Sequence, residues 1–492
     1  MSIHSPDPRR WAALALIAVA QFLVIMDTSI IGVALPEIQR AIGFSQVELS
    51  WVFNAYVIAF GGLLLLGGRL SDLYGPRRVF AGGFAILAGA SLLTGLATSE
   101  VVLLAGRALQ GVGSALIAPA ALTLLMTLFS HDPRELTKAL ALYGAAAPAG
   151  GTAGVFMGGL LTDAVDWPWV FFINVPIALV VLAVMGRILP AGLVRRGNLD
   201  ILGALSVTAA LSLAVFGIVR APEIGWGSPE TLLVLGSAIG LLVLFIAFQA
   251  RSREPLMPLS IWRAPNLAAA NVAMALLGAA WIPMWFFLNL YLQQVLRFGA
   301  FEGGAALLPM TVTIMVLMVG VTARLVGRFG FKAPLVSGML VLAGGIGWLG
   351  FVRPDGTFLV DILPATIVAA TGMSLAYIPA MLAALSGAQP AEGGLAAGIV
   401  NTTYQVGSAL GLAVITAVAT AAGAAQLGDV TALTDGFRAA FVGAAAIAVT
   451  GATVSFVTLR RSVPMRVAAS ESASVRSTSD SGYADRAASV RP

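Results

Sequence analysis

One acidic residue lies deep inside an apolar stretch of the chain. Asp27 interrupts the stretch from residue 11 to residue 34, and it is the only acidic residue well inside such a stretch. A charged side chain at the centre of a bilayer costs about 3 kcal/mol on insertion scales, so it persists where it faces a partner or a cavity. Burial penalises the charged form, which lets such a carboxyl group bind and release protons near physiological pH. A structural hydrogen bond to a neighbouring helix is the alternative.

Arg107 is the basic residue best placed to pair with this acid. It lies six residues after Val101, where another apolar stretch begins, and Asp27 lies seven residues before Ala34, where the first stretch ends. At about 1.5 Å per residue, both lie roughly 9–11 Å below the outer ends of their helices. A nearby guanidinium stabilises the carboxylate, and separating the helices removes that stabilisation. The pair is therefore predicted to couple proton binding to conformation; a fixed salt bridge is the alternative.

The other residues with reactive side chains do not form the common catalytic sites. The chain has no cysteine, and its two histidines, His4 and His131, lie outside the apolar stretches. Neither of the two lysines, Lys138 and Lys332, follows a glycine, so the phosphate-binding GxxxxGK[ST] loop is absent. The GxSxG and HExxH signatures are also absent. We therefore expect no enzymatic activity, no metal and no cofactor.

The composition requires that these side chains be held by helices in a membrane. Of 492 residues, 59% are hydrophobic and 10% are charged, against about 25% charged in a soluble domain. A bilayer core of about 30 Å needs roughly 20 apolar residues as helix, and the chain contains fourteen such runs. Their approximate limits are 11–34, 50–68, 79–98, 101–128, 138–163, 169–189, 200–220, 231–250, 266–294, 303–323, 334–352, 358–385, 395–424 and 437–459.

The distribution of basic residues predicts the orientation of these runs. With the N-terminus in the cytoplasm, 22 of the 28 basic residues fall on cytoplasmic segments and five on outer loops. Cytoplasmic loops carry such an excess, so we expect a multi-pass protein of the cell membrane with both termini in the cytoplasm. Its basic residues would contact anionic lipid and not nucleic acid. The tail is rich in Ser, Ala and Arg and is predicted to be disordered.

A short loop sequence occurs twice. Residues 68–78 read GRLSDLYGPRR and residues 323–333 read ARLVGRFGFKA, at an offset of 255. The repeat divides the chain into two six-span halves, an arrangement typical of transporters. The predicted segments are a cytoplasmic N-terminus (1–10), an N-terminal bundle (11–189), two additional helices with linkers (190–265), a C-terminal bundle (266–459) and a cytoplasmic tail (460–492).

The GRLSDLYGPRR loop resembles the loop signature of the major facilitator superfamily. The strings LVIMDTSIIGVALP, LLAGRALQGVGSALIAP, VFFINVPIAL and GLAAGIVNTTYQVGSALGLAV are similar to motifs of its fourteen-span drug:proton antiporters. The resemblance implies an all-α integral membrane protein made of two six-helix bundles with two extra central helices. It also implies proton-coupled efflux of drugs or antibiotics by alternating access, with no cofactor and with a monomer in the bilayer.

The resemblance also implies that the first copy of the loop is a conformational gate. Its gate residues would be Gly68, Arg69, Asp72, Gly75, Arg77 and Arg78. Two glycines permit a tight turn, and Asp72 could lie at the positive end of a helix from the second half. Simple positive-inside anchoring would explain the arginines but not the aspartate or the glycines. Gly327 replaces the aspartate in the second copy, so that half cannot make the same contact.

Other residues form two weaker groups. A substrate cavity could involve Gln110, Tyr56, Trp285, Tyr291, Asn401 and Gln405, besides Trp281, Phe286, Phe287 and Tyr404. The polar ones could equally join helices by hydrogen bonds, and aromatic residues also anchor membrane interfaces. The antiporter motif GPxxGG reads GVFMGG here. Helix bending would then depend on Pro148, Gly154, Gly158 and Gly159.

The most consistent interpretation is a proton-coupled exporter of lipophilic small molecules. The tenth run, LLPMTVTIMVLMVGV, contains no acid, which favours neutral or monovalent substrates over divalent cations. Two alternatives remain. A facilitator-type importer predicts several polar groups in both halves of the cavity, and a membrane-embedded enzyme needs a catalytic constellation at depth. A channel is disfavoured by the doubled six-span arrangement.

Overall fold

A computed structural model gives the fold of residues 9–44, 51–192, 201–252, 255, 259–386, 393–424, 426 and 428–460. Helices make up nearly all of this part of the chain, and it contains no strand. The predicted tail lies almost entirely outside the described residues, as does most of the predicted N-terminal segment. The all-α prediction is confirmed.

The N-terminal half consists of six spans. The helices are α1 (Arg10–Ser29), α2 (Ile31–Ile42), α3 (Trp51–Tyr74), α4 (Pro76–Gly95), α5 (Glu100–Phe129), α6 (Pro133–Ala164), α7 (Trp169–Phe172) and α8 (Asn174–Ile188). The first span continues from α1 into α2 through Ile30, which has helical backbone angles. The sixth span is divided between α7 and α8 by the single residue Ile173.

Two further helices connect the halves. They are α9 (Ile201–Ile224) and α10 (Pro229–Arg251), and the short helix η2 (Leu259–Arg263) follows them. Helix α9 packs against α3 and α16, and α10 packs on α9. The additional pair therefore lies beside the two bundles, and most of the side chains of α10 remain exposed to the surroundings.

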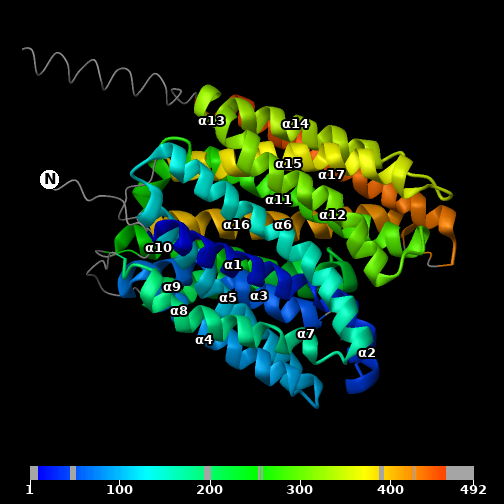
Figure 1. Ribbon diagram of the computed structural model, residues 1–492, viewed down its shortest axis with the longest axis horizontal. Helices are drawn as coiled ribbons and strands as arrows, with labels where there is room; N and C mark the ends of the chain where they lie inside the picture. Colours follow the sequence, from blue (N-terminus) through cyan, green and yellow to red (C-terminus); the bar gives the residue numbers. More distant parts are fainter. Residues whose placement is uncertain are drawn as a thin grey trace, which may run out of the picture.

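The C-terminal half repeats the six-span arrangement with more interruptions. Its α-helices are α11 (Leu267–Leu290), α12 (Ala300–Leu317), α13 (Ala323–Phe329), α14 (Lys332–Leu349), α15 (Leu363–Leu385), α16 (Gly393–Ala419) and α17 (Val430–Thr458). Four of its spans contain π-helical turns, namely η3 (Tyr291–Val295), η4 (Met318–Thr322), η5 (Phe358–Ile362) and η7 (Thr420–Ala424). In Figure 1 the blue-to-cyan helices of the first half lie below the yellow-to-orange helices of the second.

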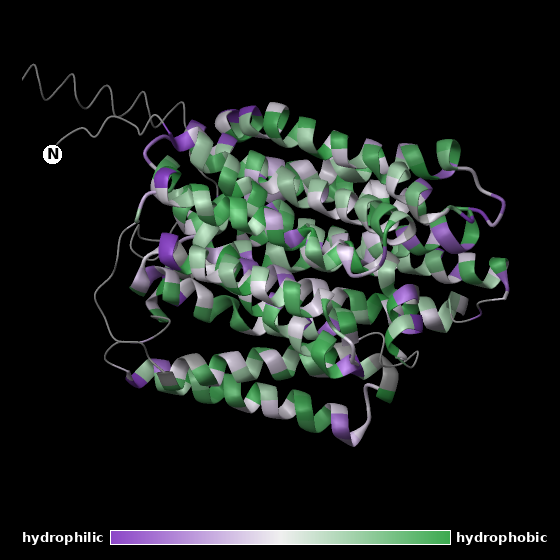
Figure 2. Cartoon of the chain, turned by 60° about the horizontal axis from the view of Figure 1, so that its bottom comes forward, coloured by the Kyte–Doolittle hydropathy of each residue, from purple (hydrophilic) through white to green (hydrophobic). Residues whose placement is uncertain are grey.

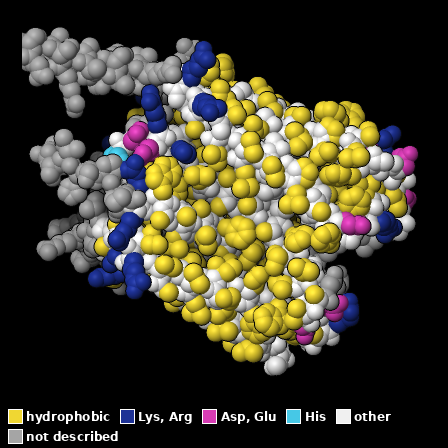
Figure 3. Space-filling model, viewed as in Figure 1, with side chains coloured by type: hydrophobic (Ala, Val, Ile, Leu, Met, Phe, Trp, Pro, Cys, Tyr) yellow, Lys and Arg dark blue, Asp and Glu magenta, His cyan; other side chains and the backbone are white. Residues whose placement is uncertain are grey.

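The described helices are long and apolar enough to cross a bilayer. Thirteen of them meet that criterion in the described part of the chain, and α9 supplies a fourteenth with a shorter apolar stretch, Leu205–Ile218. Helices suit this environment because their backbone polar groups are satisfied internally. In Figure 2 hydrophobic residues colour much of the helical ribbon green, and Figure 3 shows hydrophobic side chains over the visible face, with most of the visible Lys and Arg near its left end. The prediction of a multi-span membrane protein is confirmed.

Both copies of the repeated loop turn at a glycine with a positive φ angle. Gly75 joins α3 to α4 with φ 89°, and Gly330 follows α13 with φ 73°. The Gly75 amide donates to the Ser71 carbonyl at 3.1 Å, and the Gly330 amide donates to the Val326 carbonyl at 2.9 Å. Only glycine adopts such positive φ angles without steric cost. Glycine at both positions therefore lets each helix pair turn sharply at the cytoplasmic end that the sequence predicts.

A basic side chain beside each of these glycines fastens its half in the same way. An Arg77 Nη1 donates to the carbonyl of Leu189, the residue that caps α8, at 3.1 Å. The Lys332 Nζ donates to the carbonyl of Leu459, the residue that caps α17, at 2.5 Å. A cation near a helix C-terminus satisfies a free carbonyl and interacts favourably with the helix dipole. Each half thus ties the start of its third span to the end of its sixth.

The two halves meet along α6 and α12 and along α3 and α16. The hydroxyls of Thr152 and Thr311 lie 2.5 Å apart across the first of these contacts. Gly398 brings α16 close to Leu64 and Leu65 of α3, because a methyl group added there would lie 3.4 Å from the Leu64 carbonyl oxygen. At these two points the halves therefore touch through neutral groups.

The positive φ of Gly75 generates a testable prediction. Gly75→Ala should lower the free energy of unfolding by about 1–3 kcal/mol, because an L-residue is strained at that angle. The matched control is Gly89→Ala in the neighbouring helix α4, where an added methyl group meets nothing within 4 Å. That control should leave stability unchanged or raise it, since alanine favours helix. Thermal unfolding in detergent checks both variants, and equal losses would contradict the prediction.

Candidate functional site

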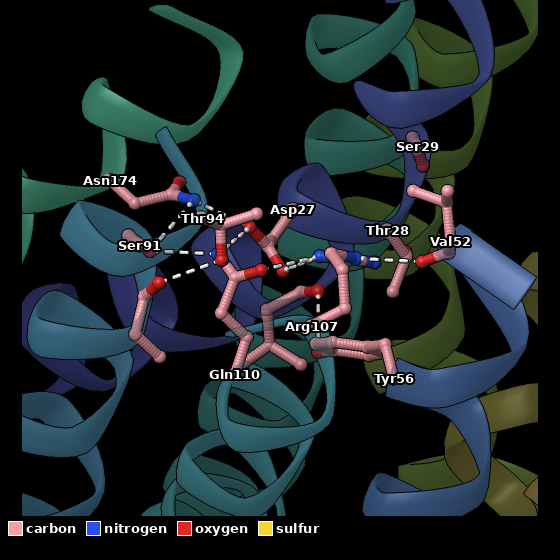
Figure 4. Close-up of polar contacts among 12 residues, drawn as sticks. Asp27, Thr28, Ser29, Val52, Tyr56, Ser91, Thr94, Arg107, Gln110 and Asn174 are labelled. Atoms are coloured by element: carbon pink, nitrogen blue, oxygen red, sulfur yellow. Dashed lines mark hydrogen bonds and ion pairs between the residues drawn. The ribbon is translucent and has the colours of Figure 1, made fainter. Parts of the chain in front are cut away.

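The carboxyl group of Asp27 is completely enclosed by the N-terminal half. It lies on α1, near the end of that helix, and its relative exposure is 0%. Helices α5 and α8 supply polar partners to its two oxygens, and α4 supplies a third helix behind them (Figure 4). The predicted acid is therefore buried in protein and does not face lipid.

The predicted contact between Asp27 and Arg107 is confirmed. An Arg107 Nη1 lies 2.9 Å from the Asp27 Oδ2, and both side chains have 0% exposure. The Arg107 Nε donates to the carbonyl of Val52 at 2.9 Å, and its guanidinium lies 4.7 Å from the ring centre of Tyr56. The carbonyl and the aromatic face both stabilise a cation. The arginine is thus fixed by α3 as well as by the acid.

Three neutral residues complete the cluster, which we call the Asp27 cluster. Gln110 donates through Nε2 to the Asp27 Oδ1 at 3.0 Å and to the Ser91 Oγ at 2.8 Å. Its Oε1 accepts from an Arg107 Nη1 at 2.8 Å. Asn174, at the start of α8, donates through Nδ2 to the same Asp27 Oδ1 at 2.5 Å. The Asp27 cluster therefore consists of Asp27, Arg107, Gln110, Ser91, Asn174 and Tyr56.

Two glycines of α5 allow the neighbouring helices to reach this cluster. A side chain at Gly106 would overlap the hydroxyl of Thr94 on α4, and one at Gly111 would overlap the carbonyl of Tyr56 on α3. Small residues permit such close helix contact in membranes. The string GRALQG thus places its arginine and its glutamine between two glycines that bring α3 and α4 within reach.

The electrostatics of the cluster depend on the pairing of one anion with one cation. Two opposite charges removed from water are stable only when geometry and further hydrogen bonds are good. The Asp27 carboxylate accepts hydrogen bonds from three side chains, and the Arg107 guanidinium also has a carbonyl partner. A proton added to the carboxylate would remove one charge of the pair and weaken it. The arrangement can therefore exchange an internal ion pair for a bound proton.

The residues predicted to line a substrate cavity separate into different places. Gln110 and Tyr56 belong to the Asp27 cluster, and the Tyr56 hydroxyl donates to the Val24 carbonyl at 3.3 Å. The Tyr291 hydroxyl donates to the Arg353 carbonyl at 2.6 Å, at the opposite end of the C-terminal half from Gly330. The sequence left two roles open for Gln110, contact with substrate or a hydrogen bond between helices. In the structure Gln110 forms hydrogen bonds between helices.

Around Tyr291 the C-terminal half has an ion pair of its own. The Arg353 guanidinium binds both carboxylate oxygens of Asp361, at 2.9 and 3.1 Å, and the Thr357 amide donates to Asp361 at 2.8 Å. Hydrogen bonds and charge from this acid raise the pKa of Arg353 above its ordinary value. The arginine is about half exposed, so this pair closes a loop and does not form a buried counterpart of the Asp27 cluster.

The remaining cavity candidates lie in the C-terminal half. Trp285 on α11 and the two polar residues of α16, Asn401 and Gln405, are partly buried. Tyr404, between those two, stacks edge-on with Tyr377 of α15 at 5.9 Å between ring centres. These residues lie apart from the Asp27 cluster, on helices of the other half.

The gate residues surround the turn at Gly75. Gly68, Arg69 and Asp72 are buried, and neither of the two charged residues is without a partner. Arg77 is partly buried and Arg78 is exposed. The bond from Arg77 to Leu189 is made within the N-terminal half. This bond connects the loop to its own half of the protein. Helix α3, which leads into the loop, also contacts α16 of the other half.

The glycines predicted to bend α6 lie against α1. Pro148 is inside α6, which runs as one helix through it. Added side chains would overlap the Phe22 carbonyl at Gly150, and would lie 2.8 Å from the Met26 carbonyl at Gly154 and 2.7 Å from the Ile30 carbonyl at Gly158. These glycines are spaced at four residues and form one packing face. Gly159 is also buried. This face holds α6 against α1 on both sides of Asp27.

Asn174 and Ser91 are the cluster members that the sequence did not single out. Asn174 lies in VFFINVPIAL, a string recognised for its resemblance and not for its polar residue. An uncharged amide in an apolar run is the signal that would have indicated it, because buried polar groups need partners. Ser91 offers no comparable signal, since a lone serine commonly bonds within its own helix.

Comparisons with known proteins agree with this architecture. Residues 17–412 match the family model described as Major Facilitator Superfamily. A cephamycin export protein of Amycolatopsis lactamdurans is 38% identical over 92% of this chain and 93% of its own. A puromycin resistance protein of Streptomyces alboniger is 39% identical over 87% of this chain and 85% of its own. The structure of the human organic anion transporter MFSD10 is similar in fold, with a TM-score of 0.65 at 15% identity over 92% of this chain and 100% of that one.

The contact of α6 with α1 predicts a difference between two adjacent glycines. Gly150→Ala must push α1 and α6 apart, because its methyl group would overlap the Phe22 carbonyl. We expect it to cost about 1–3 kcal/mol of stability. Gly151→Ala meets nothing closer than 3.7 Å and should be tolerated. Thermal unfolding in detergent compares the two, and a Gly151→Ala protein as unstable as Gly150→Ala would contradict this packing.

The buried pair predicts that two variants together are less harmful than one of them. Arg107→Met leaves the Asp27 carboxylate in the interior without its cation, which should cost about 3 kcal/mol. Adding Asp27→Asn removes the stranded charge, so the double variant should recover most of that loss. A double-mutant cycle by thermal unfolding measures the coupling. A double variant no more stable than Arg107→Met would mean that the two charges do not depend on each other.

Proposed function

Because this chain belongs to the Major Facilitator Superfamily, and is therefore a membrane transporter, we propose that it exports lipophilic small molecules across the cytoplasmic membrane in exchange for protons. Its relatives include proteins named for cephamycin export and puromycin resistance. Antibiotics and similar toxic compounds are therefore the substrates to be tested first. The observation that carries the proton-coupled part of the proposal is the fully buried pair of Asp27 and Arg107.

Proton coupling follows from the chemistry of this pair. When the carboxylate is charged, it is held to Arg107 and the helices α1 and α5 stay together. When a proton enters from outside, the pair loses its attraction and the packing of α1 against α5 can change. The proton gradient then drives return to the inward-facing state, and the cycle needs no cofactor.

Alternating access requires that the two halves move as units. The basic residues Arg77 and Lys332 support this, because each ties helices of its own half together. Two of the contacts between halves support it too, since the Thr152–Thr311 pair and the approach at Gly398 involve neutral groups. Rocking of the halves would break such contacts at moderate cost, with Gly68, Arg69, Asp72 and Gly75 as the gate on the cytoplasmic side.

The substrate would bind between the halves, where aromatic and neutral polar side chains meet. The Tyr143 hydroxyl of α6 donates to the Gln21 side chain of α1 at 2.7 Å. Gly144 of α6 lies against the ring of Tyr377, and Tyr377 stacks on Tyr404. Such side chains suit a neutral or monovalent aromatic compound, since rings provide apolar contact and cation–π attraction. The tenth span contributes no acid for a second positive charge.

The orientation belongs to the proposal as well. Both termini would lie in the cytoplasm, at the end where Lys and Arg gather in Figure 3. Drugs would then leave from the cytoplasm, and protons would enter from the outer side toward Asp27.

Two other functions make different predictions. An importer of sugars or peptides would use charged or multiply polar groups from both halves, whereas the buried Asp27 cluster lies in the N-terminal half alone. A membrane-embedded enzyme would need paired acids, a nucleophile with a base, or metal ligands at depth. The pair of Asp27 and Arg107 fits neither requirement.

Proton flux in sealed vesicles tests the proposal. Inside-out vesicles with an acidic interior are given candidate compounds, namely lipophilic cations, neutral antibiotics and sugars, while a fluorescent dye reports the interior pH. We expect an exported compound to raise the interior pH, because protons leave as the compound enters.

Asp27→Asn should abolish this pH response while the protein stays folded in the membrane. The matched control is Asp361→Asn, which removes another mostly buried carboxylate that is paired with an arginine and should leave proton exit intact. Proton exit at the wild-type rate in Asp27→Asn would refute the coupling role, and a response to sugars alone would indicate an importer.

A further inference from the structure

Asn174 has one amide atom that is used and one that is not. Its Nδ2 donates to the Asp27 Oδ1 at 2.5 Å, whereas its Oδ1 is buried without a hydrogen-bond partner in the described part of the chain. The whole side chain has 0% exposure. A buried acceptor left unpaired costs about 1–3 kcal/mol. The unpaired Asn174 Oδ1 beside a titratable carboxyl group therefore needs a physical explanation.

The two amide atoms suit two different forms of Asp27. A carboxylate only accepts hydrogen bonds, so it needs the Asn174 Nδ2. A protonated carboxyl group has an O–H donor, so it needs an acceptor, which the Asn174 Oδ1 can provide. The separation of 2.5 Å also lies within the range of O–H···O bonds, about 2.5–3.0 Å. One side chain can therefore satisfy both forms by turning its amide.

We propose that Asn174 is the proton sensor of this transporter: when Asp27 takes up a proton, the Asn174 amide turns by half a rotation and accepts the new O–H at its Oδ1. One proton adds to the Asp27 carboxylate, and no other covalent bond forms or breaks. This inference rests on the proposed proton coupling. Asn174 is a positioning residue in it, because it contacts the proton-binding group and not the exported compound.

The other groups around Asp27 cannot take this role. Gln110 is fixed at both ends, because its Oε1 accepts from Arg107 while its Nε2 donates to Asp27 and Ser91. The charged and titratable groups that face Asp27 are Arg107 on α5 and Tyr56 on α3. Arginine has no acceptor, and the tyrosine hydroxyl is directed at a carbonyl of α1 and makes no hydrogen bond to Asp27 in the described part of the chain. Asn174 is the neighbour with a free acceptor.

The position of Asn174 in the sixth span would let a change in its side chain alter the bend of that span. Ile173, directly before it, keeps helical backbone angles, and Pro176 follows two residues later without an amide N–H, so that one helix hydrogen bond is missing at this point. Phe172 of α7 lies tightly against Gly95 at the end of α4. A change at Asn174 therefore acts where a proline already weakens the helix, and small bends cost less there than in an uninterrupted helix.

Two other asparagines provide matched controls. The Asn271 Oδ1 and the Asn289 Oδ1 are also buried without hydrogen-bond partners in the described residues. Their Nδ2 groups donate to the carbonyls of Leu267 and Trp285, at 2.9 and 3.0 Å. A backbone carbonyl never takes up a proton at physiological pH. An unpaired oxygen alone is therefore not a sensor, and these two residues should be silent when Asp27 titrates.

Infrared difference spectroscopy tests the proposal on the full-length protein in lipid. The sample contains asparagine labelled with 15N in its side chain, and spectra at neutral and acidic pH are subtracted. We expect the carboxyl band of protonated Asp27 and a shifted band of a labelled amide to appear together. Both should be absent in Asp27→Asn, and the amide signal should be absent in Asn174→Leu but present in Asn271→Leu.

The outcomes separate this proposal from the proposed function. A wild-type protein without a carboxyl signal from Asp27 overturns the proton coupling itself. A carboxyl signal without any change in the labelled amide overturns only the sensor, and this comparison needs no variant that must fold. In vesicles, Asn174→Leu should slow proton-coupled export about tenfold or more, as expected for a lost hydrogen bond to a charged group. Asn271→Leu should retain the wild-type rate, and equal rates for both variants would also overturn the sensor.

Discussion

A carboxylate and a guanidinium buried in the same half of a membrane protein can be tolerated only together. The pair of Asp27 and Arg107 imposes this constraint, because both side chains are fully enclosed and either charge alone would be costly. Residues of five helices form the Asp27 cluster, and glycines on several helices of this half, among them α5 and α6, let neighbouring backbones come close. A proton is the simplest way to relieve the constraint, since it neutralises one member of the pair. Protonation of Asp27 would therefore affect how the helices of the N-terminal half pack.

The two halves share a framework but not this chemistry. Gly75 and Gly330 both have a positive φ angle, and Arg77 and Lys332 fasten the same pair of spans in each half. The C-terminal half instead contains π-helical turns in four spans, and such turns occur frequently at functional sites. This asymmetry fits a transporter in which one half binds the proton and the other contributes flexible helices and aromatic rings to the substrate.

The sequence predicted the features that depend on charge and on long apolar runs. Asp27 and Arg107 were recognisable because ionised groups are rare at such depth, and matching their depths in two helices predicted the contact. The all-helical bundle followed from the apolar runs. The place of Asn174 in the cluster was not predictable in this way, because a neutral amide does not indicate its partner and its contacts, Asp27 and Ser91, lie on two helices distant in the sequence. The bond from the Tyr291 hydroxyl to the Arg353 carbonyl was not predictable either, because the two residues are 62 positions apart in the sequence.

The central claim is that substrate binding and proton binding compete through the Asp27 carboxyl group. Proton release by the purified protein in weakly buffered solution tests this most directly, because it needs no gradient and no transport. Addition of an exported compound should release protons from the wild-type protein, and the same addition should release none from Asp27→Asn although the compound still binds. Release of protons in equal amount from both proteins would contradict the account.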